Sequence, residues 1–150
     1  MCCERNAGMS KKRKLPLTPV CHYCGRNAIL VDDSEVYSRS YGGKVWLCRH
    51  CSAWVGTHRN SPRHLPLGRL AKADLRRQKI IAHDLFDALW RAAMQHRKWS
   101  KSLARLSAYS WLAREMGIDK KHCHIGMMDE AQTQRVIDIC RPHVEKRRAA

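Results

Sequence analysis

Two Cys-x-x-Cys pairs constrain the fold of this chain more than any other feature. Cys21 and Cys24 form the first pair, and Cys48 and Cys51 form the second. A Cys-x-x-Cys turn places two sulfurs on one side of a tight loop. Two such turns, joined by antiparallel strands, offer four thiolates to one Zn²⁺ and leave no position open for water or substrate. The spacing therefore predicts a zinc ribbon with one structural zinc ion, and two disulfides or four unrelated thiols are the alternative.

Size and cysteine content set wider limits. The 150 residues fit one domain or two small ones. Eight cysteines would suit a small secreted disulfide scaffold, but the chain opens without an apolar signal segment and its cysteine pairs have metal spacing. We therefore expect a reducing cytosol. No apolar run approaches the roughly 18 residues that a membrane helix requires, so no membrane association is expected. No small-molecule substrate is evident, and Cys2 and Cys3 receive no role.

Positive charge is the second strong signal. The formal net charge is +16 at pH 7. Residues 52–80 hold seven Lys or Arg against the single acid Asp74, so the excess is concentrated just after the second cysteine pair. Such a density of bases is typical of proteins whose partner carries phosphates, because neutralised phosphates release counterions. The composition favours DNA or RNA as the partner, with a basic but inert surface as the alternative.

Composition and periodicity divide the chain into five segments. The start lacks periodicity and has a run of four bases followed by Pro16 and Pro19, which predicts a disordered arm. Gly, Pro, His and Arg dominate the stretch after the ribbon, which predicts a connector. The expected order is a basic arm over 1–20, the zinc ribbon over 21–57, a basic connector over 58–69, a helical module over 70–143 and a basic tail over 144–150.

Short strands are expected inside the ribbon, over 28–31, 35–41 and 44–47. Gly42 and Gly43 predict a type I′ hairpin turn, since both central residues of that turn need a positive φ. The acids around Asp33 are expected to cap a turn. Trp46 and Trp54 are expected to pack in the small core, with stacking on nucleic-acid bases as the alternative.

Helical periodicity begins near residue 70. Three helices are expected, over 70–95, 103–116 and 129–141. Ser100 or Ser102 is a candidate N-cap of the second helix, and Gly117 suits a left-handed residue after its end. A capping box is expected to begin the third helix at Asp129, and Pro142 is expected to end it. The predicted fold class is α+β, a small N-terminal zinc-ribbon β-hairpin module followed by a three-helix C-terminal module.

Bases on the ribbon edge, the connector and the first helix are the predicted contacts with nucleic acid. Three of them lie near the start of that helix, where each cation costs a few tenths to about 1 kcal/mol against the helix dipole, so we expect them to serve a partner. A solvated helix face is the alternative. Binding through phosphates is expected to be largely independent of base sequence. The predicted set is Arg39, Lys44, Arg49, His50, Arg59, Arg63, Arg69, Lys72, Arg76, Arg77 and Lys79.

Five other side chains have the chemistry of metal ligands. They are His122, Cys123, His124, Cys140 and His143. None of them forms a pair with the spacing of the zinc ribbon, and a buried free cysteine is more often a small apolar residue of the core. A second metal site is left open by the sequence.

His58 and Asn60 follow the second cysteine pair, and zinc knuckles near His and Asn resemble nucleases of the His-Asn-His type. The order of the residues differs from those enzymes. A hydrolase also needs a base, an electrophilic stabiliser and an open metal position, and the sequence offers no convergent set. We predict that the protein is not an enzyme, with a metal-dependent nuclease as the least favoured alternative.

Several short motifs point together to a known family. They are the two cysteine turns over 21–25 and 46–51, Pro66-Leu67-Gly68, the segment over 108–113 and Cys123-His124-Ile125-Gly126. In combination they resemble the zinc-finger-containing family of bacteriophage and prophage proteins, over roughly residues 21–141. The resemblance implies a zinc-binding ribbon, a helical C-terminal half and a phage-borne origin.

These observations lead to two functional hypotheses. The first is a phage or prophage accessory protein that binds nucleic acid, with the ribbon and the following helix forming one basic face. The second is a zinc-stabilised protein-interaction module that docks on a host or phage complex. Zinc ribbons serve both uses, so the fold alone does not decide between them.

Overall fold

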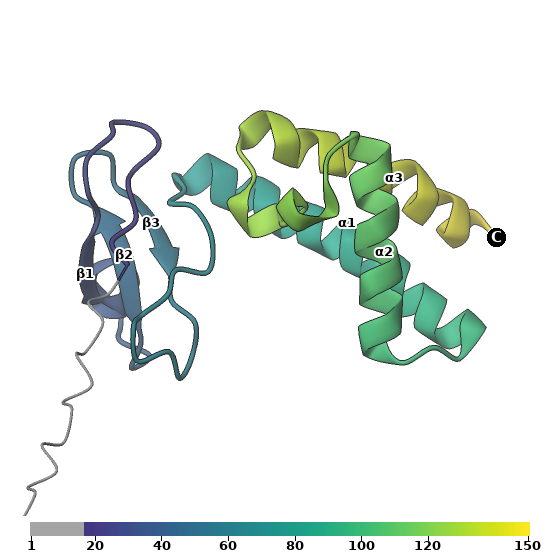
Figure 1. Cartoon of the computed structure of the whole chain (residues 1–150), viewed down its shortest axis with the longest axis horizontal. Coiled ribbons are helices and arrows are strands. Elements are labelled where there is room, and N and C mark those ends of the chain that lie inside the picture. Colours follow the sequence, from purple (N-terminus) through teal and green to yellow (C-terminus); the bar gives the residue numbers. More distant parts are fainter. Residues whose placement is uncertain (1–16) are drawn as a thin grey trace, which may run out of the picture.

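The computed structural model describes residues 17–150, so most of the expected basic arm lies outside the described residues. Figure 1 shows a small sheet at one end of the molecule and a group of helices at the other. Three strands are followed along the chain by three α-helices, with short 3-10 turns between some of them. This is the predicted α+β class, with a ribbon module before a helical module. Within 17–150 no helix combines the length and the apolar character needed to cross a membrane.

The sheet is antiparallel, with the strand order β1-β2-β3. Its strands are β1 (Ile29–Asp32), β2 (Lys44–Cys48) and β3 (Ala53–Gly56). The first two agree with the predictions over 28–31 and 44–47 to within one residue. β3 was not predicted as a strand, because four residues are too few to show an alternating pattern. It is defined by pairing along β2, where Val55 lies opposite Trp46.

The predicted strand over 35–41 is wrong, because a buried carboxylate folds this segment into a loop. Asp33 is only 4% exposed. Its carboxylate accepts hydrogen bonds from Ser40 Oγ at 2.8 Å and from the backbone N–H groups of Tyr41 and Gly43 at 3.0 Å each. These bonds draw the far end of the loop back to the start of its 3-10 turn, so the backbone cannot run extended. The prediction that an acid caps this turn is confirmed for Asp33.

The turn that leads into β2 also differs from the prediction. Gly42 has a φ of +80°, whereas Gly43 does not have a positive φ. A type I′ turn needs positive φ at both central residues, so that assignment is wrong. The Asp33 carboxylate, rather than a tight two-residue turn, sets the geometry here.

The connector over 58–69 is attached to the sheet in its middle and just beyond its far end. Beyond its far end, Ala71 pairs with Trp54 of β3 through two backbone hydrogen bonds of 3.0 and 3.1 Å. In its middle, the carbonyl of His64 accepts a hydrogen bond from Trp46 Nε1 at 2.7 Å. Trp46 is 3% exposed, which confirms the prediction that it packs in the ribbon core.

The three helices are α1 (Ala73–Arg97), α2 (Lys101–Met116) and α3 (Glu130–Ala149). Local capping signals set the start of α2, the end of α2 and the start of α3. Ser100 Oγ accepts from the N–H of Leu103 at 3.2 Å and caps α2. Gly117 ends α2 with a φ of +67°, and Asp129 forms a capping box with Gln132 at the start of α3. These predicted caps are confirmed.

The predicted end of the third helix is wrong. Pro142 lies inside α3, which continues to Ala149, so residues 144–149 of the expected basic tail are helical. Pro142 is exposed, whereas Val144 is 5% exposed and belongs to the helical core. A proline in a helix interior costs about 3 kcal/mol or more through the lost hydrogen bond and the ring clash. Burial of Val144, worth about 1.5–3 kcal/mol, offsets much of that cost.

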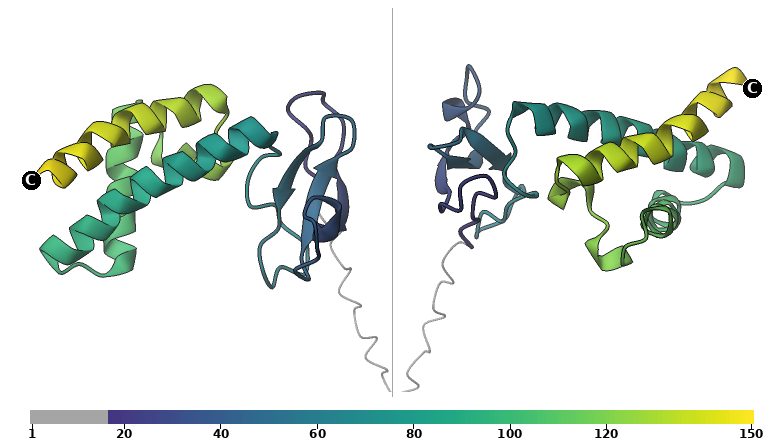
Figure 2. Two further views of the ribbon diagram at one scale, coloured as in Figure 1. Left: turned by 180° about the vertical axis from the view of Figure 1, so that it is seen from behind. Right: turned by 90° about the horizontal axis from the view of Figure 1, so that it is seen from above.

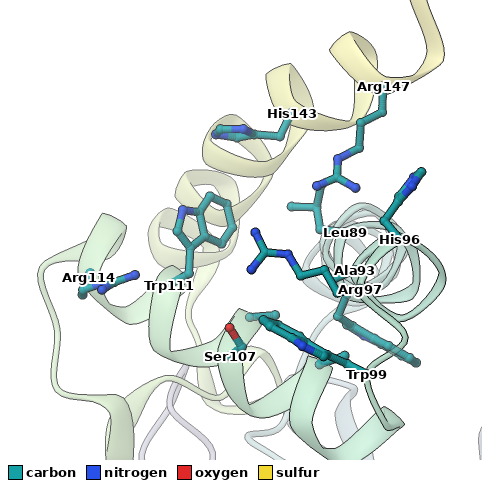
Figure 3. A pocket seen from close by; sticks show the side chains of 13 residues that line it. Leu89, Ala93, His96, Arg97, Trp99, Ser107, Trp111, Arg114, His143 and Arg147 are labelled. Atoms are coloured by element: carbon teal, nitrogen blue, oxygen red, sulfur yellow. The ribbon is translucent and has the colours of Figure 1, made fainter. Parts of the chain in front are cut away.

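The three helices form one module. Figures 1 and 2 show α1 and α3 side by side, with α2 crossing them. At the end of the module farthest from the sheet, all three helices line a pocket, which Figure 3 shows from close by.

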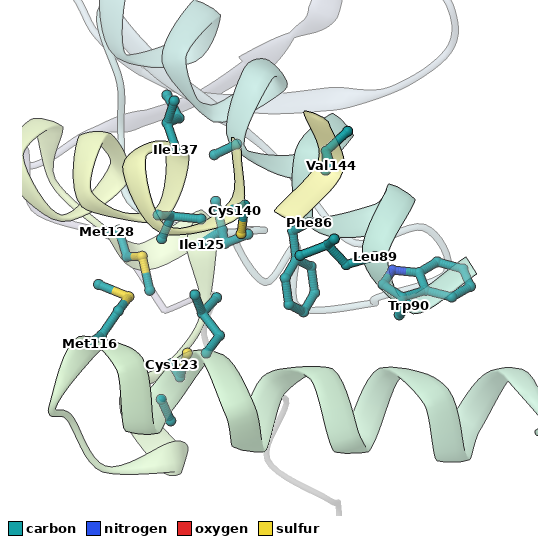
Figure 4. Packing of buried hydrophobic residues seen from close by; sticks show 14 of the residues in the cluster. Phe86, Leu89, Trp90, Met116, Cys123, Ile125, Met128, Ile137, Cys140 and Val144 are labelled. Atoms are coloured by element: carbon teal, nitrogen blue, oxygen red, sulfur yellow. The ribbon is translucent and has the colours of Figure 1, made fainter. Parts of the chain in front are cut away.

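The helical module has its own apolar core, separate from that of the ribbon. Phe86 of α1, Leu112 of α2 and Val136 of α3 are at most 1% exposed. Ile125, in the turn before α3, is equally buried, and Figure 4 shows it among the side chains of this cluster. Because each module has a core of its own, the contacts between the modules decide how they sit together.

Two sets of contacts join the ribbon to the helical module. Gly68 of the connector lies against Gly126, so closely that a Cβ on Gly68 would lie 2.1 Å from the Gly126 carbonyl oxygen. The N–H of Arg69 donates to the same oxygen at 3.0 Å. In the first cysteine turn, Tyr23 Oη donates to Glu130 Oε1 at 2.8 Å, at the start of α3. The end of the connector and the first cysteine turn therefore fix the ribbon on the helices.

Candidate metal centre and basic cleft

The four cysteines of the two Cys-x-x-Cys pairs converge. The Sγ atoms of Cys21, Cys24, Cys48 and Cys51 all lie within 4.8 Å of one another. The Sγ atoms of Cys24 and Cys48 are 3.6 Å apart. A tetrahedron of sulfurs around zinc, with bonds of about 2.3 Å, has edges of roughly 3.8 Å. The thiols are therefore spaced as a single zinc ion requires.

The same type of backbone hydrogen bond closes both cysteine turns. The N–H of Gly25 donates to the carbonyl of Cys21 at 2.8 Å, and the N–H of Ser52 donates to the carbonyl of Cys48, also at 2.8 Å. Gly25 and Ser52 each follow the second cysteine of a pair, and their φ values are +74° and +55°. Each turn closes on itself and directs its two sulfurs to the same side.

At neutral pH the four thiols do not all ionise unless a cation is bound among them. Burial and hydrogen bonds with Cys24 and Cys21 raise the pKa of the Cys51 thiol to about 12. Burial also opposes ionisation of Cys48, but the backbone N–H of Cys51 and the thiol of Cys24 outweigh it and lower the pKa of Cys48 to about 7. Bound Zn²⁺ displaces the remaining thiol protons and stabilises four thiolates at short range.

Comparison with known families agrees with this geometry. A family model described as a zinc-finger-containing domain matches residues 17–143. The chain belongs to this family. A search of the curated proteins and a search of the solved structures found no match.

This zinc-finger-containing protein holds a single structural zinc ion on its four cysteines. Cys21 and Cys48 are buried, and Cys24 and Cys51 are half-buried. Four sulfurs complete the tetrahedron, so the ion organises the fold and offers no position to a substrate. The zinc site predicted from the cysteine spacing is confirmed.

The other candidate metal ligands are spread over the helical module. Cys123 and Cys140 are at most 1% exposed and belong to its apolar core. His124 packs near Tyr109, and His143 meets Trp111 edge-on. Within residues 17–150, the zinc-ribbon cysteines are the one group of three or more such ligands close enough to share an ion. Cys123 and Cys140 therefore pack as apolar side chains.

A basic cleft lies between the ribbon and the helical module. It has a volume of about 700 Å³, and β3, the connector, α1, α2 and the turn before α3 contribute to its walls. None of its lining residues in the described part of the chain is a carboxylate. Its cationic and imidazole side chains are Arg69, Arg76, Lys79, Arg105, His58, His83 and His124.

Two of these cations are fixed by contacts with the walls. Lys79 Nζ donates to the carbonyl of Gly126 at 2.7 Å. Burial, helped by the charge of Arg69, lowers the pKa of Lys79 to about 8. The guanidinium of Arg76 lies 4.4 Å from the centre of the Trp54 ring and donates to the carbonyl of Ala71. Both cations are half-buried, so a bound anion would replace hydration that they lack.

The structure brings three of the predicted contact residues together in this cleft, namely Arg69, Arg76 and Lys79. Three others pair with carboxylates on the surface: Lys44 with Asp32 at 2.8 Å, Arg49 with Glu35 at 3.4 Å, and Arg77 with Asp74. An exposed ion pair of this kind contributes little energy, and its cation is partly neutralised.

The remaining predicted residues lie outside the basic cleft. Arg39 stacks over the ring of Tyr41 at 4.9 Å, and Lys72 stacks over Tyr23 at 4.7 Å. The others are His50 and Arg59, which are exposed, and Arg63, which is half-buried. Trp54 is half-buried and carries Arg76 on its ring, so it is less enclosed than Trp46.

Sequence reasoning missed Arg105, His83 and His124 as members of this cleft. Arg105 and His124 come from α2 and from the turn before α3, which approach the ribbon only in the folded chain. One signal was present in the sequence. Gly68 and Gly126 both lie in short motifs of the sequence, Pro66-Leu67-Gly68 and Cys123-His124-Ile125-Gly126, and paired glycines allow two backbones to approach closely.

Proposed function

We propose that this zinc-finger-containing protein binds DNA or RNA through backbone phosphates held in the basic cleft. The observation that carries the proposal is the set of four cations and three histidines that line this cleft without a carboxylate among its described residues. A phosphate that enters there meets charge-assisted donors, and no carboxylate is among the described residues that line the cleft. Phosphate contacts carry no base information, so binding is largely independent of sequence.

Salt dependence of binding tests this proposal. Fluorescence anisotropy with a labelled duplex should show affinity falling by orders of magnitude between low and moderate salt. The variant with Arg69→Gln, Lys79→Gln and Arg105→Gln removes three cleft cations. Each lost phosphate contact lowers the slope of log affinity against log salt by about 0.9 for duplex DNA, so the slope should fall by about two to three.

A matched variant distinguishes the effect of the cleft cations from the effect of net charge. Lys44→Gln, Arg49→Gln and Arg77→Gln also remove three cations, all of which pair with surface carboxylates. This variant should keep most of the wild-type affinity and slope. Equal losses in the two triple variants would show that nonspecific net charge, and not the basic cleft, carries binding. Zinc content and far-UV circular dichroism verify that both variants fold.

A protein partner is the second candidate function. Exposed apolar side chains on α1 and α2 favour it, namely Ile80, Ile81, Leu103 and Leu106. Such side chains support protein contacts rather than phosphate contacts. Absence of salt-dependent binding to duplex and single-stranded probes, with a partner retained after nuclease treatment and lost in the Leu103→Ser, Leu106→Ser variant, would favour this function.

The proposal describes binding without catalysis, in a bacteriophage or prophage accessory protein that acts in the bacterial cytoplasm. The phage origin rests on the resemblance of the shared motifs alone. His58 is exposed at the edge of the basic cleft. An oligonucleotide incubated with the protein and Mg²⁺ or Mn²⁺ should stay intact. Cleavage that His58→Ala abolishes would instead identify a nuclease.

A further inference from the structure

The pocket at the end of the helical module farthest from the sheet is separate from the zinc site and from the basic cleft. It has a volume of about 730 Å³. Figure 3 shows it between α1, α2 and α3. Pockets that bind small ligands typically measure about 300–1,000 Å³. The space therefore suits one small molecule or one group displayed by a larger partner.

Three of the five tryptophans in the chain line this pocket. Trp90 belongs to α1, Trp99 to the turn between α1 and α2, and Trp111 to α2. Trp90 is buried, while Trp99 and Trp111 are half-buried. His143 of α3 meets the Trp111 ring edge-on, with the centroids 5.2 Å apart and the planes at 90°. Half-exposed indoles offer flat faces on which a planar ring can stack.

Each helix also contributes one arginine to the pocket. They are Arg97 of α1, Arg114 of α2 and Arg147 of α3. The guanidinium of Arg97 lies 4.8 Å from the centre of the Trp99 ring, and Figure 3 shows it extending into the middle of the pocket. Guanidinium groups bind phosphate with two parallel donors and also stack on aromatic rings.

These arginines are not neutralised by neighbouring acids. Over residues 17–150, none of the three forms an ion pair, whereas Arg91 of α1 pairs with Asp87 at 3.5 Å. The described lining residues of the pocket include no carboxylate either. A ligand that brings negative charge and an aromatic ring complements both features of this pocket.

We propose that this pocket binds one unpaired nucleotide, with the base against the indoles and the phosphate on the arginines. A base inside a duplex is already stacked on its neighbours and cannot enter, so the ligand is unpaired. An acidic peptide would satisfy the arginines but supplies no planar ring to match the two half-exposed indoles. The proposal is independent of the basic cleft, which lies at the other end of the helical module.

Tryptophan fluorescence of the full-length zinc-loaded protein, titrated with adenosine 5′-monophosphate, tests the proposal. The nucleotide should quench the fluorescence in a saturable way. Adenosine lacks the charge-assisted contacts and inorganic phosphate lacks the stacked ring, so each should bind about tenfold more weakly. Arg97→Gln and Arg147→Gln should each weaken nucleotide binding by about tenfold.

Matched variants locate the site. Arg141→Gln removes an exposed arginine from the same helix as Arg147, outside the pocket lining, and should leave the affinity unchanged. Trp99→Phe should remove part of the quenching, whereas Trp54→Phe in the ribbon should not. The variant with Arg69→Gln and Lys79→Gln, two cleft cations outside the pocket lining, should bind the nucleotide normally, so failure of one proposal does not imply failure of the other.

Three results would overturn the proposal. The first is nucleotide binding no tighter than that of inorganic phosphate, which would show simple attraction of anions. The second is an Arg141→Gln loss as large as the Arg147→Gln loss. The third is a short polyglutamate peptide that displaces the nucleotide at lower concentration, which would identify an acidic peptide as the ligand.

Discussion

Replacement of Gly68 by alanine tests how the ribbon is attached to the helical module. The added Cβ would lie 2.1 Å from the carbonyl oxygen of Gly126 and 2.6 Å from its carbonyl carbon. Ordinary carbon–oxygen contacts are about 3.3–3.6 Å, so the two backbones must separate by about 1 Å or more. That shift also breaks the 3.0 Å hydrogen bond from Arg69 N–H to Gly126.

The expected loss of stability follows from these two effects. Overpacking of a close contact costs about 1–3 kcal/mol, and a lost backbone hydrogen bond adds about 1 kcal/mol. The free energy of unfolding should therefore fall by about 2–4 kcal/mol. At about 2–4 °C for each kcal/mol in a chain of this size, the melting temperature should fall by about 10 °C. Thermal unfolding of the zinc-loaded protein, followed by circular dichroism, measures this.

Two other glycines provide graded controls. A Cβ on Gly126 would lie 3.0 Å from the Leu67 carbonyl oxygen, a milder contact, so Gly126→Ala should cost less than Gly68→Ala. A Cβ on Gly42 meets no atom within 4 Å, so Gly42→Ala should cost only the strain of its positive φ, about 1 kcal/mol. A Gly68→Ala protein as stable as the Gly42→Ala protein would refute the reasoning.

Three further predictions concern the zinc site, the ribbon loop and the basic cleft. Removal of zinc with a chelator should unfold the ribbon while most of the helical circular dichroism persists, because the helices have their own core; loss of all helical signal would contradict this. Asp33→Ala should lower the melting temperature at neutral pH. Burial raises the pKa of the Asp33 carboxyl, but the hydrogen bonds that the carboxylate accepts outweigh this effect and lower the pKa below the unfolded value of 3.8. The ionised carboxylate therefore stabilises the fold above pH 3.8, and this stabilisation is lost as the pH falls through the lower folded pKa. The melting temperatures of wild type and variant should therefore converge in acid. Burial lowers the pKa of Lys79 to about 8, so phosphate binding should weaken between pH 7 and 9 as Lys79 loses its proton. Over the range from pH 8 to the unfolded pKa of 10.5, the contribution of Lys79 to the free energy of unfolding should rise with pH, because the unfolded chain holds the proton more tightly. Lys79→Gln should flatten this binding profile, and an unchanged profile would exclude Lys79 from the site.

Features determined by neighbouring residues were predictable from the sequence. The two Cys-x-x-Cys turns each close through a hydrogen bond between residues four apart, and their spacing was sufficient to identify the zinc site. The caps at Ser100, Gly117 and Asp129 depend likewise on residues within a few positions along the chain. Local signals of this kind do not require knowledge of the fold.

Features determined by the burial of particular side chains were not predictable. The segment over 35–41 has the composition of a strand, yet the buried carboxylate of Asp33 holds it as a loop. Pro142 was expected to end α3, but Val144 packs in a core shared with α1 and α2 and extends the helix. The outcome in both cases depends on which side chains become buried, which a single sequence does not specify.

The candidate sites likewise contain some residues that the sequence indicates and others that only the fold brings together. Arg69, Arg76 and Lys79 were selected because charge clusters along the chain near them. Arg105 could not be selected, because α2 reaches the basic cleft only after the helices fold. The pocket lined by Trp99 and Trp111 has the same origin, since three separate helices must converge before its arginines surround one space.

The basic cleft has walls of two kinds. On one side, β3 and the connector depend on a metal ion for their shape, and on the other the helices depend on a close-packed apolar core. Acid, oxidants and chelators release the zinc ion and so unfold the first wall, whereas the second wall unfolds when heat or denaturants disrupt its apolar core. Unfolding of either wall removes the cleft between them. Ligand binding in the cleft should therefore be lost as soon as the less stable module unfolds, while much of the remaining structure is still folded.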